Sequence, residues 1–229
     1  MTPSLATEPF DTVVLDLDGT LVDSVYVHTL AWRAAFRDVG IEVPAHRLHR
    51  AIGLGGDRLV AHVSDDRVER AVGDTVRERH AHHLDARFHD ITPTEGASDL
   101  LETLHERGLH LVVATSGDRE MTDRLLGLVP GAHSFLEQTV SGSDAEESKP
   151  AGDLVAAALR AVGAASAVML GDATWDAQSA AEAGLPCLGL LSGGITAAEL
   201  TDAGCVAVYD SPADLVARLD ASLLGHGPR

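Results

Sequence analysis

Thr12-Val13-Val14-Leu15-Asp16-Leu17-Asp18-Gly19-Thr20 joins a short apolar run to two carboxylates and a polar turn. The run over 12–15 is typical of a buried strand, and Asp16 ends it abruptly. Two carboxylates two residues apart at the end of such a strand repel each other and lose hydration, so holding them together is costly unless a cation joins them. The segment therefore predicts a buried strand that delivers an acidic site.

Apolar runs that end in polar or glycine-containing turns recur along the chain, which predicts the fold class. They cover 109–114, 167–170, 186–191 and, less clearly, 205–208. Helical patterns lie between them, over 97–107, 150–163 (opened by Pro150) and 176–183. This alternation predicts a doubly wound, Rossmann-like α/β fold with a parallel sheet. Ligands of such sheets bind at the carboxyl ends of the strands, where Asp16, Thr115 and Asp172 fall.

Residues 23–92 break this alternation. They contain no convincing strand, and helical patterns cover 24–39, 57–62 and 68–84. We expect a helical cap over 23–92, inserted into an α/β core made of 11–22 and 93–229. Its hinges would lie near Asp23 and near Thr92-Pro93, and covering the site as a lid would be a natural role for it.

The charge of the chain excludes two classes of partner. The 229 residues include 17 Lys and Arg against 35 Asp and Glu, which gives a formal net charge of −18. Such acidity argues against binding to nucleic acid or to an anionic membrane. No apolar run approaches the roughly 20 residues of a membrane-spanning helix, and Cys187 and Cys205 form no metal or redox motif. We expect a cytoplasmic monomer or homodimer whose partner is a small molecule.

The segment from Asp16 to Thr20 resembles DxDG[TV], the first motif of the haloacid dehalogenase (HAD) superfamily. Thr115-Ser116 resembles the second motif of that family, and Lys149-Pro150 resembles the third. The segment Gly171-Asp172-Ala173-Thr174-Trp175-Asp176 resembles the fourth motif, GDxxxD. The four motifs follow in the family's order within residues 11–215. The resemblance implies a HAD core with a small helical cap, Mg²⁺ dependence and a phosphorylated small-molecule substrate.

The residues of these motifs meet the demands of phosphoryl transfer, which needs a nucleophile, charge neutralisation and a proton donor. Asp16 would attack phosphorus and form an aspartyl-phosphate. Asp18 would protonate the leaving alcohol and later deprotonate the attacking water. Lys149 would stabilise the phosphoryl oxygens, and Thr115 and Ser116 would bind the phosphoryl group through a hydroxyl and a backbone N–H.

The acidic residues predict the metal site. A site built only from oxygen ligands suits Mg²⁺. Asp16, the backbone carbonyl of Asp18 and Asp172 would be the ligands, with Asp176 bound directly or one shell further out. Asp172 and Asp176 could also cap the helix that they precede, and this role is compatible with metal binding.

Several residues of the expected cap are candidates for contacts with substrate. His28 lies twelve residues after Asp16, where β-phosphoglucomutase-like HAD proteins also carry a histidine, but a histidine on the helix surface explains it equally well. The run Gly53-Leu54-Gly55-Gly56-Asp57 resembles the cap's substrate-specificity loop, in which Gly55 and Gly56 permit close approach, although a plain turn is an equal alternative. Arg58 could steer an anionic substrate.

Other conspicuous residues have simpler interpretations. We expect the histidines of the second half of the cap to form a solvated helix face rather than a metal cluster, although the spacing of two of them comes near that of metal ligands on one helix face. These histidines are His80, His82, His83 and His89. We expect Trp175 to pack against the cap.

The sequence favours a Mg²⁺-dependent phosphomonoester hydrolase acting on phosphoglycolate or a sugar phosphate. A phosphosugar mutase is the main alternative, because His28 and Trp32 match the mutase-like proteins. Ile52 stands where those proteins usually carry a lysine, however, and GDxxxD is the phosphatase form of the fourth motif. A non-catalytic binding module that keeps the fold is the second alternative, against which the intact motifs argue.

Overall fold

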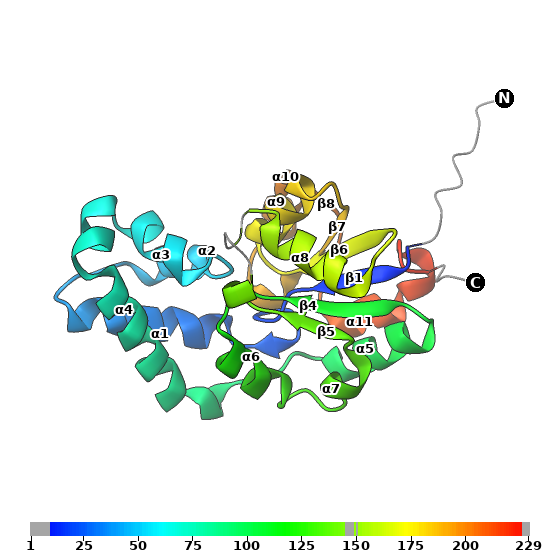
Figure 1. Cartoon of the computed structure of the whole chain (residues 1–229), viewed down its shortest axis with the longest axis horizontal. Helices are drawn as coiled ribbons and strands as arrows, with labels where there is room; N and C mark the ends of the chain where they lie inside the picture. Colours follow the sequence, from blue (N-terminus) through cyan, green and yellow to red (C-terminus); the bar gives the residue numbers. More distant parts are fainter. Residues whose placement is uncertain (1–9, 145–148, 150, 226–229) are drawn as a thin grey trace.

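The computed structural model describes residues 10–144, 149 and 151–225, and its centre is a six-stranded parallel sheet (Figure 1). The strand order is β5-β4-β1-β6-β7-β8, and each neighbouring pair runs parallel. The strands are β1 (Thr12–Leu15), β4 (His110–Ala114), β5 (Gln138–Val140), β6 (Ala167–Gly171), β7 (Cys187–Leu190) and β8 (Cys205–Tyr209). The predicted doubly wound α/β fold is confirmed.

Helices cover both faces of the sheet (Figure 1). Successive side chains of a strand point to opposite faces, and those of β1 are apolar or buried on both. Val13 and Leu15 pack into one hydrophobic cluster, and Val14 packs into another. The first cluster includes residues of α5 (Ala97–Glu106), α6 (Arg119–Leu126), α7 (Ala132–Phe135) and α11 (Pro212–Ala217). The second includes residues of α8 (Asp153–Val162), α9 (Thr174–Glu182) and α10 (Ala197–Ala203). Burial on both faces explains why β1 shows no polar alternation.

The predicted core strands all form, and the differences lie in short elements. The edge strand β5 was not predicted, because a three-residue strand with an exposed first residue carries little hydrophobic signal. Helix α9 begins at Thr174, earlier than expected. The helix expected from Pro150 begins at Asp153 as α8, and Pro150 itself lies outside the described residues. Four 3₁₀ turns complete the described elements, namely η1 (Phe88–Asp90), η2 (Gly142–Asp144), η3 (Leu191–Gly193) and η4 (Leu219–Ala221).

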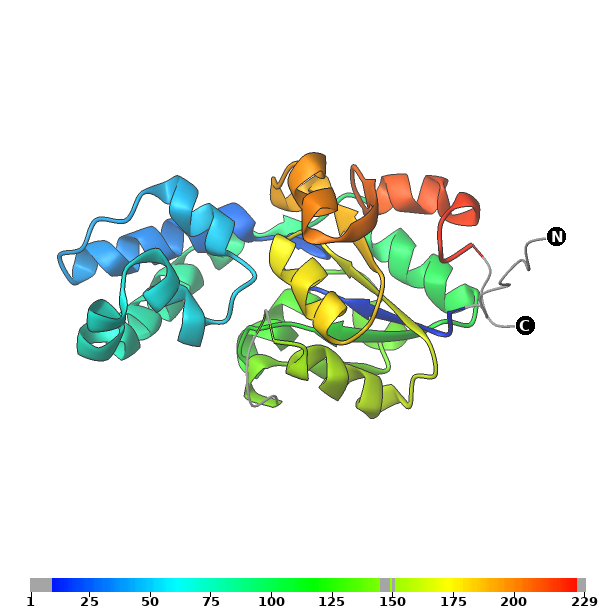
Figure 2. The same cartoon turned by 90° about the horizontal axis from the view of Figure 1, so that it is seen from above.

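A group of helices lies together at one end of the molecule (Figures 1 and 2). They are α1 (Val25–Asp38), α2 (Ala45–Ala51), α3 (Gly56–Val63) and α4 (Asp66–Ala86). They enclose a hydrophobic cluster of their own, which includes Trp32, Phe36 and Leu59. This separate cluster supports our proposal that residues 23–92 form a cap domain on a core of 11–22 and 93–229.

The helical segment joins the sheet through a two-stranded antiparallel ribbon. Strand β2 (Val22–Asp23) pairs with β3 (Thr92–Pro93), with Asp23 opposite Thr92. The expectation of no strand within 23–92 is therefore wrong at its two ends. Both strands are only two residues long, too short to show a periodic pattern. The ribbon lies at the two positions where hinges were expected.

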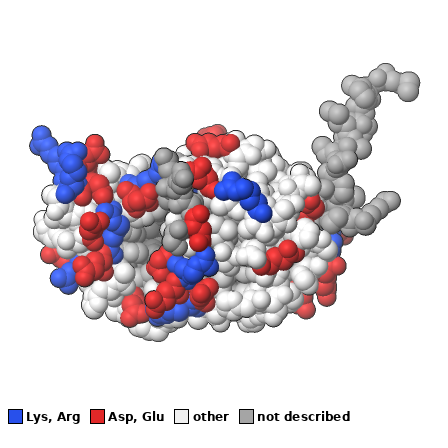
Figure 3. Space-filling model, in the orientation of Figure 1, with Lys and Arg blue, Asp and Glu red and all other residues white. Residues whose placement is uncertain are grey.

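Charged side chains of both signs share the surface. On the face shown in Figure 3, basic side chains are interspersed with acidic ones. Among the helices that the structure describes, none has both the length and the apolar character that crossing a membrane requires.

Candidate active site

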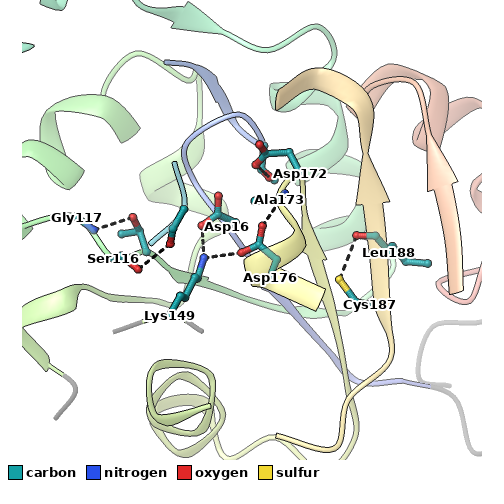
Figure 4. Close-up of polar contacts among 12 residues, drawn as sticks. Asp16, Ser116, Gly117, Lys149, Asp172, Ala173, Asp176, Cys187 and Leu188 are labelled. Carbon is teal, nitrogen blue, oxygen red and sulfur yellow. Dashed lines mark hydrogen bonds and ion pairs between the residues drawn. The ribbon is translucent and has the colours of Figure 1, made fainter. Parts of the chain in front are cut away.

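Three buried carboxylates meet at the carboxyl edge of the sheet (Figure 4). Strands β1 and β6 are adjacent and parallel, with Leu15 opposite Leu170, so the residues that follow them emerge side by side. Asp16 follows β1 directly, Asp172 follows β6, and Asp176 lies in the first turn of α9. One carboxylate oxygen from each of the three lies within 4.8 Å of the others.

The Lys149 ammonium binds two of these carboxylates. Its side chain is fully buried, and Nζ donates to Asp16 and, at 2.8 Å, to Oδ1 of Asp176 (Figure 4). Burial alone would lower the pKa of Lys149, but the charges of Asp16 and Asp176 outweigh it and hold that pKa above its usual value. Lys149 therefore places a permanent positive charge beside Asp16.

One ammonium does not neutralise three carboxylates. Burial, and then the charge of Asp176, raise the pKa of Asp16 to about 7 against the pull of Lys149. Burial and the charges of Asp16 and Asp176 raise the pKa of Asp172 well above its usual range. A further cation is needed before all three can be ionised together. Because every side-chain ligand atom here is a carboxylate oxygen, Mg²⁺ fits this site, whereas zinc sites usually include nitrogen or sulfur ligands.

A hydroxyl group and two closely packed glycines fix the Asp172 carboxylate in place. The Thr20 hydroxyl donates to its Oδ1 at 3.1 Å. Gly19 has a φ of +82°, and a Cβ there would lie 2.3 Å from Oδ2 of Asp172. A Cβ on Gly193 would lie 1.7 Å from the same atom. The Ser192 hydroxyl joins the two loops by donating to the carbonyl of Gly19 at 2.6 Å. Ser192 and Gly193 belong to the turn after β7, and the folding of the chain brings this turn to Asp172.

Asp18 takes part in a second polar network. Its Oδ1 accepts from the Ser24 hydroxyl at 2.5 Å and lies 3.1 Å from Nε2 of His28. Nδ1 of His28 lies 3.1 Å from Nε2 of His80. Burial would raise the pKa of Asp18, but the charge and the hydrogen bond of His28, with the bond from Ser24, bring it below its usual value. Asp18 is thus held as a carboxylate.

His80 departs from the expected solvated helix face, and that expectation is wrong for this residue. Its ring stacks on Trp32 with centroids 3.9 Å apart, and burial, followed by the charge of His28, lowers its pKa well below the usual value. His83 instead pairs with Asp38 at 2.8 Å on the surface. The positions of His28 and His80 on separate helices leave no sequence signal that joins them.

A cavity of about 290 Å³ lies in front of Asp16 and Asp18. Both are part of its lining, as are four of the predicted substrate-binding residues, His28, Gly56, Thr115 and Ser116. Gly55 and Arg58 do not belong to the described lining, and Lys149 stands behind Asp16. The structure thus gathers residues of the first and second motifs and His28 around one cavity.

The glycine loop of the helical segment, residues 53–57, packs directly against the α/β core. Gly53 has a φ of +99°, its carbonyl accepts from the Ser116 hydroxyl at 3.2 Å, and a Cβ there would lie 3.1 Å from side-chain atoms of Ala173 and Trp175. The Trp175 indole donates to the carbonyl of Arg50 at 2.9 Å. Trp175 therefore packs against the helical segment, as expected.

Known proteins are similar to this chain in sequence or in fold. The family model for haloacid dehalogenase-like hydrolases matches residues 10–184. The chain is similar to the phosphoglycolate phosphatase of Caulobacter vibrioides, with 31% identity over 216 residues that cover 89% of this chain and 88% of that protein. It is also similar to the solved structure of a hydrolase from Pseudomonas syringae, with a TM-score of 0.87, 34% identity and coverage of 92% and 98%. The β-phosphoglucomutase of Clostridium difficile shares the fold at a TM-score of 0.80 and 15% identity, with coverage of 94% and 97%.

Proposed function

The chain belongs to the haloacid dehalogenase-like hydrolase family, and from this premise we propose that it is a Mg²⁺-dependent phosphatase of small-metabolite phosphomonoesters. The observation that carries the proposal is the Lys149 ammonium bound between Asp16 and Asp176, with Asp172 completing a buried group of three carboxylates. The similarity to a phosphoglycolate phosphatase supports a substrate of about the size of phosphoglycolate or a sugar phosphate.

The carboxylates of Asp16, Asp172 and Asp176 and the backbone carbonyl of Asp18 hold the metal in this proposal. When bound, Mg²⁺ neutralises the negative charges of the nucleophile and of the phosphoryl group, so that the two anions can approach each other. Lys149 supplies a second positive charge from behind Asp16 and favours the ionised form of that carboxyl. Lys149 acts in this way on both Asp16 and Asp172, whose pKa values burial raises.

The first half of the reaction transfers the phosphoryl group to the enzyme. A carboxylate oxygen of Asp16 forms a bond to phosphorus while the bond between phosphorus and the leaving oxygen breaks. Asp18 gives the leaving oxygen the proton that it took from water in the preceding turnover, and the alcohol departs. Thr115 and Ser116, which line the cavity at the end of β4, bind the phosphoryl oxygens.

The second half releases phosphate. Asp18, now a carboxylate, takes a proton from a water molecule as the water oxygen attacks phosphorus. The bond between phosphorus and the Asp16 oxygen breaks, which regenerates the Asp16 carboxylate and yields orthophosphate. The contact between His28 and Asp18 at 3.1 Å supports this role, because it orients the side chain and favours its ionised form.

The phosphosugar mutase alternative is less well supported by the cavity. A mutase must hold a sugar that carries a phosphate at each of two positions, and the second phosphate needs a cation of its own. Arg77 is the one Lys or Arg in the described lining, and Glu69 and Asp74 already bind its guanidinium. We therefore favour hydrolysis.

A Mg²⁺-dependent phosphate-release screen over small phosphomonoesters tests the proposal. We expect release that EDTA abolishes, that Asp16→Asn lowers by at least about 10³-fold and that Asp123→Asn, a change on the exposed face of α6, leaves unaltered. Release that Asp16→Asn does not lower, or no release from any ester, would contradict the proposal. Isomerisation of β-glucose 1-phosphate without net release would identify a mutase.

A further inference from the structure

The cavity in front of Asp16 has a lining of two unlike parts. Asp16, Asp18, Thr115 and Ser116 form the polar part, which the proposed reaction uses. The helices contribute a largely apolar part, made by Trp32 of α1, Leu59 of α3, Leu84 of α4, and Met121 and Leu125 of α6. Leu54 of the glycine loop extends this surface. A leaving group attached to a phosphate at Asp16 has this apolar surface available to it.

The cationic group in the apolar part is already bound within the protein. The Arg77 guanidinium donates to Glu69 at 2.9 Å, to Asp74 at 2.7 Å and to the carbonyl of Gly56 at 3.0 Å. Two carboxylates thus compensate its charge, and both of its terminal nitrogens already donate within the protein. A carboxylate on a substrate would have to displace one of them.

The other polar side chains near the apolar part also have partners. The hydroxyl of Thr122 donates to the carbonyl of Asp118 at 2.7 Å, and the Asp118 carboxylate accepts from the backbone N–H of Met121 at 2.9 Å. His28 and His80 bind each other, and His28 also binds Asp18. Hydroxyl groups of a sugar would lose water here and would compete with these internal hydrogen bonds.

These contacts discriminate between leaving groups. Burying a hydroxyl or carboxylate without a hydrogen-bond partner opposes binding, whereas burying hydrocarbon favours it. A carboxylate would also face Asp16, Asp18 and Asp118 across the same cavity. For comparison, an apolar cavity of about 150 Å³ holds benzene. The volume here, about 290 Å³, leaves room for a six-membered ring in addition to a phosphoryl group.

We propose that the preferred substrate is a phosphomonoester with an apolar leaving group, an alkyl, cycloalkyl or aryl alcohol, rather than phosphoglycolate or a sugar phosphate. This inference rests on the proposed phosphatase function and narrows its substrate class. The reaction is the same hydrolysis, in which the bond between phosphorus and the ester oxygen breaks and water supplies the hydroxyl of phosphate and the proton of the alcohol.

Matched pairs of esters test the preference through kcat/KM with Mg²⁺ present. The pairs are cyclohexylmethyl phosphate against glucose 6-phosphate, n-propyl phosphate against glycerol 3-phosphate, and ethyl phosphate against phosphoglycolate. We expect the apolar member of each pair to be favoured at least about tenfold. Along the n-alkyl series, each added methylene should raise kcat/KM roughly fourfold until the cavity is full, which corresponds to about 0.8 kcal/mol per buried CH₂.

The outcomes separate this inference from the proposed function. Equal hydrolysis of both members, or preference for the polar ones, would overturn the inference and leave the phosphatase intact. Hydrolysis of no ester, including aryl phosphates, would instead contradict the phosphatase itself.

A pair of variants tests whether the cavity lining causes the preference. Met121→Gln keeps the length of a lining side chain and adds an amide, so we expect it to lower the ratio for cyclohexylmethyl phosphate over glucose 6-phosphate about threefold or more. Leu128→Gln makes a comparable change at a half-buried residue outside the described lining and should leave the ratio unchanged. An unchanged ratio in Met121→Gln, or an equal fall in both variants, would overturn the inference.

Discussion

Asp18 has two partners that hold it as a carboxylate. Ser24 and His28 donate to one oxygen, and the pKa of Asp18 lies below its usual value despite burial. A carboxylate is ready to act as the base toward water, and it must gain a proton before it can act as the acid.

Replacing Asp18 by Asn tests its role in proton transfer. We expect kcat to fall by about 10²–10⁴-fold, because the amide can neither transfer a proton to the leaving oxygen nor take one from water. Binding of Mg²⁺, measured as thermal stabilisation by the ion, should be largely retained because the proposed ligand is the backbone carbonyl. Asp123→Asn serves as the control, and undiminished turnover in Asp18→Asn would exclude the role.

His80 should make the protein sensitive to acid. Its pKa lies well below the usual 6.5, first because of burial, so the unfolded state takes up a proton as the pH falls below 6.5 while the folded state does not. Its contribution to stability is therefore complete above that pH and is lost as the pH falls toward the folded pKa. We expect His80→Gln to flatten the fall in the free energy of unfolding between pH 7.5 and pH 5, measured by urea denaturation in EDTA.

His82→Gln is the matched control for this prediction, because His82 lies on the exposed side of the same helix. It should keep the pH dependence of the parent protein. Asp16, with a pKa of about 7, titrates in the same range but is present in all three proteins, so its effect cancels from the comparison. A parent-like slope in His80→Gln would show that His80 is not held neutral.

At the scale of elements, parallel strands and two loops assemble the acidic site. The register of β1 on β6 brings Asp16 and Asp172 to one edge, and the loops after β1 and β7 pack against the Asp172 carboxylate. Two glycines, Gly19 and Gly193, make that approach possible, since neither leaves space for a Cβ. The position of the metal ligand therefore depends on loop backbone as well as on the motif.

Gly193→Ala should weaken Mg²⁺ binding. The added methyl group would overlap with Oδ2 of Asp172 and force the carboxylate from its position, so we expect the Kd for Mg²⁺ to rise about 10–100-fold. Isothermal titration calorimetry measures the change. Gly127→Ala is the control, because Gly127 has a helical φ of −61° and does not line the cavity. An unchanged Kd in Gly193→Ala would show that the carboxylate tolerates displacement.

At the scale of the whole molecule, the cavity lies where the helical segment meets the sheet. Its lining combines residues that follow β1 and β4 with residues of α1, α3 and α4. The two parts touch through Gly53 with Ser116, and through Arg50 with Trp175 and Glu199. The carboxylates of the acidic site are buried. A cation that compensates their charge should therefore raise the free energy of unfolding of the whole chain.

Magnesium should stabilise the folded chain. A ligand that binds only the folded state at 100 times its Kd adds about 2.7 kcal/mol to the free energy of unfolding. We therefore expect Mg²⁺ to raise the Tm, measured by differential scanning calorimetry against an EDTA sample at pH 8. Asp123→Asn should respond to Mg²⁺ as the parent does.

Asp172→Asn should lose this response. In EDTA at pH 8 the variant should be at least as stable as the parent, because a carboxyl whose pKa is raised on folding opposes folding above its unfolded pKa. A full Mg²⁺ response in Asp172→Asn would show that the ion binds elsewhere.

The predicted fold and family membership followed from local patterns and are confirmed. An apolar strand is recognisable from its own residues. A residue directly after such a strand, such as Asp16 or Asp172, can be placed as well, because the carboxyl ends of parallel strands bind ligands at one edge of the sheet. Element ends and the edge strand β5 were less predictable, because a few residues carry too weak a signal. The catalytic and metal-binding roles of the motif residues remain predictions, although the structure brings Asp16, Asp172, Asp176 and Lys149 together.

Contacts between distant segments were decided only by the tertiary structure. His80 meets His28 because α4 packs along α1, and nothing in either helix identifies the other as its partner. Gly193 approaches Asp172 only once β7 is placed beside β6. The apolar surface opposite Asp16 is formed by leucines such as Leu59 and Leu84, which also belong to the buried hydrophobic clusters. Local patterns report which face of an element is apolar, whereas packing decides whether that face fills a core or lines a cavity.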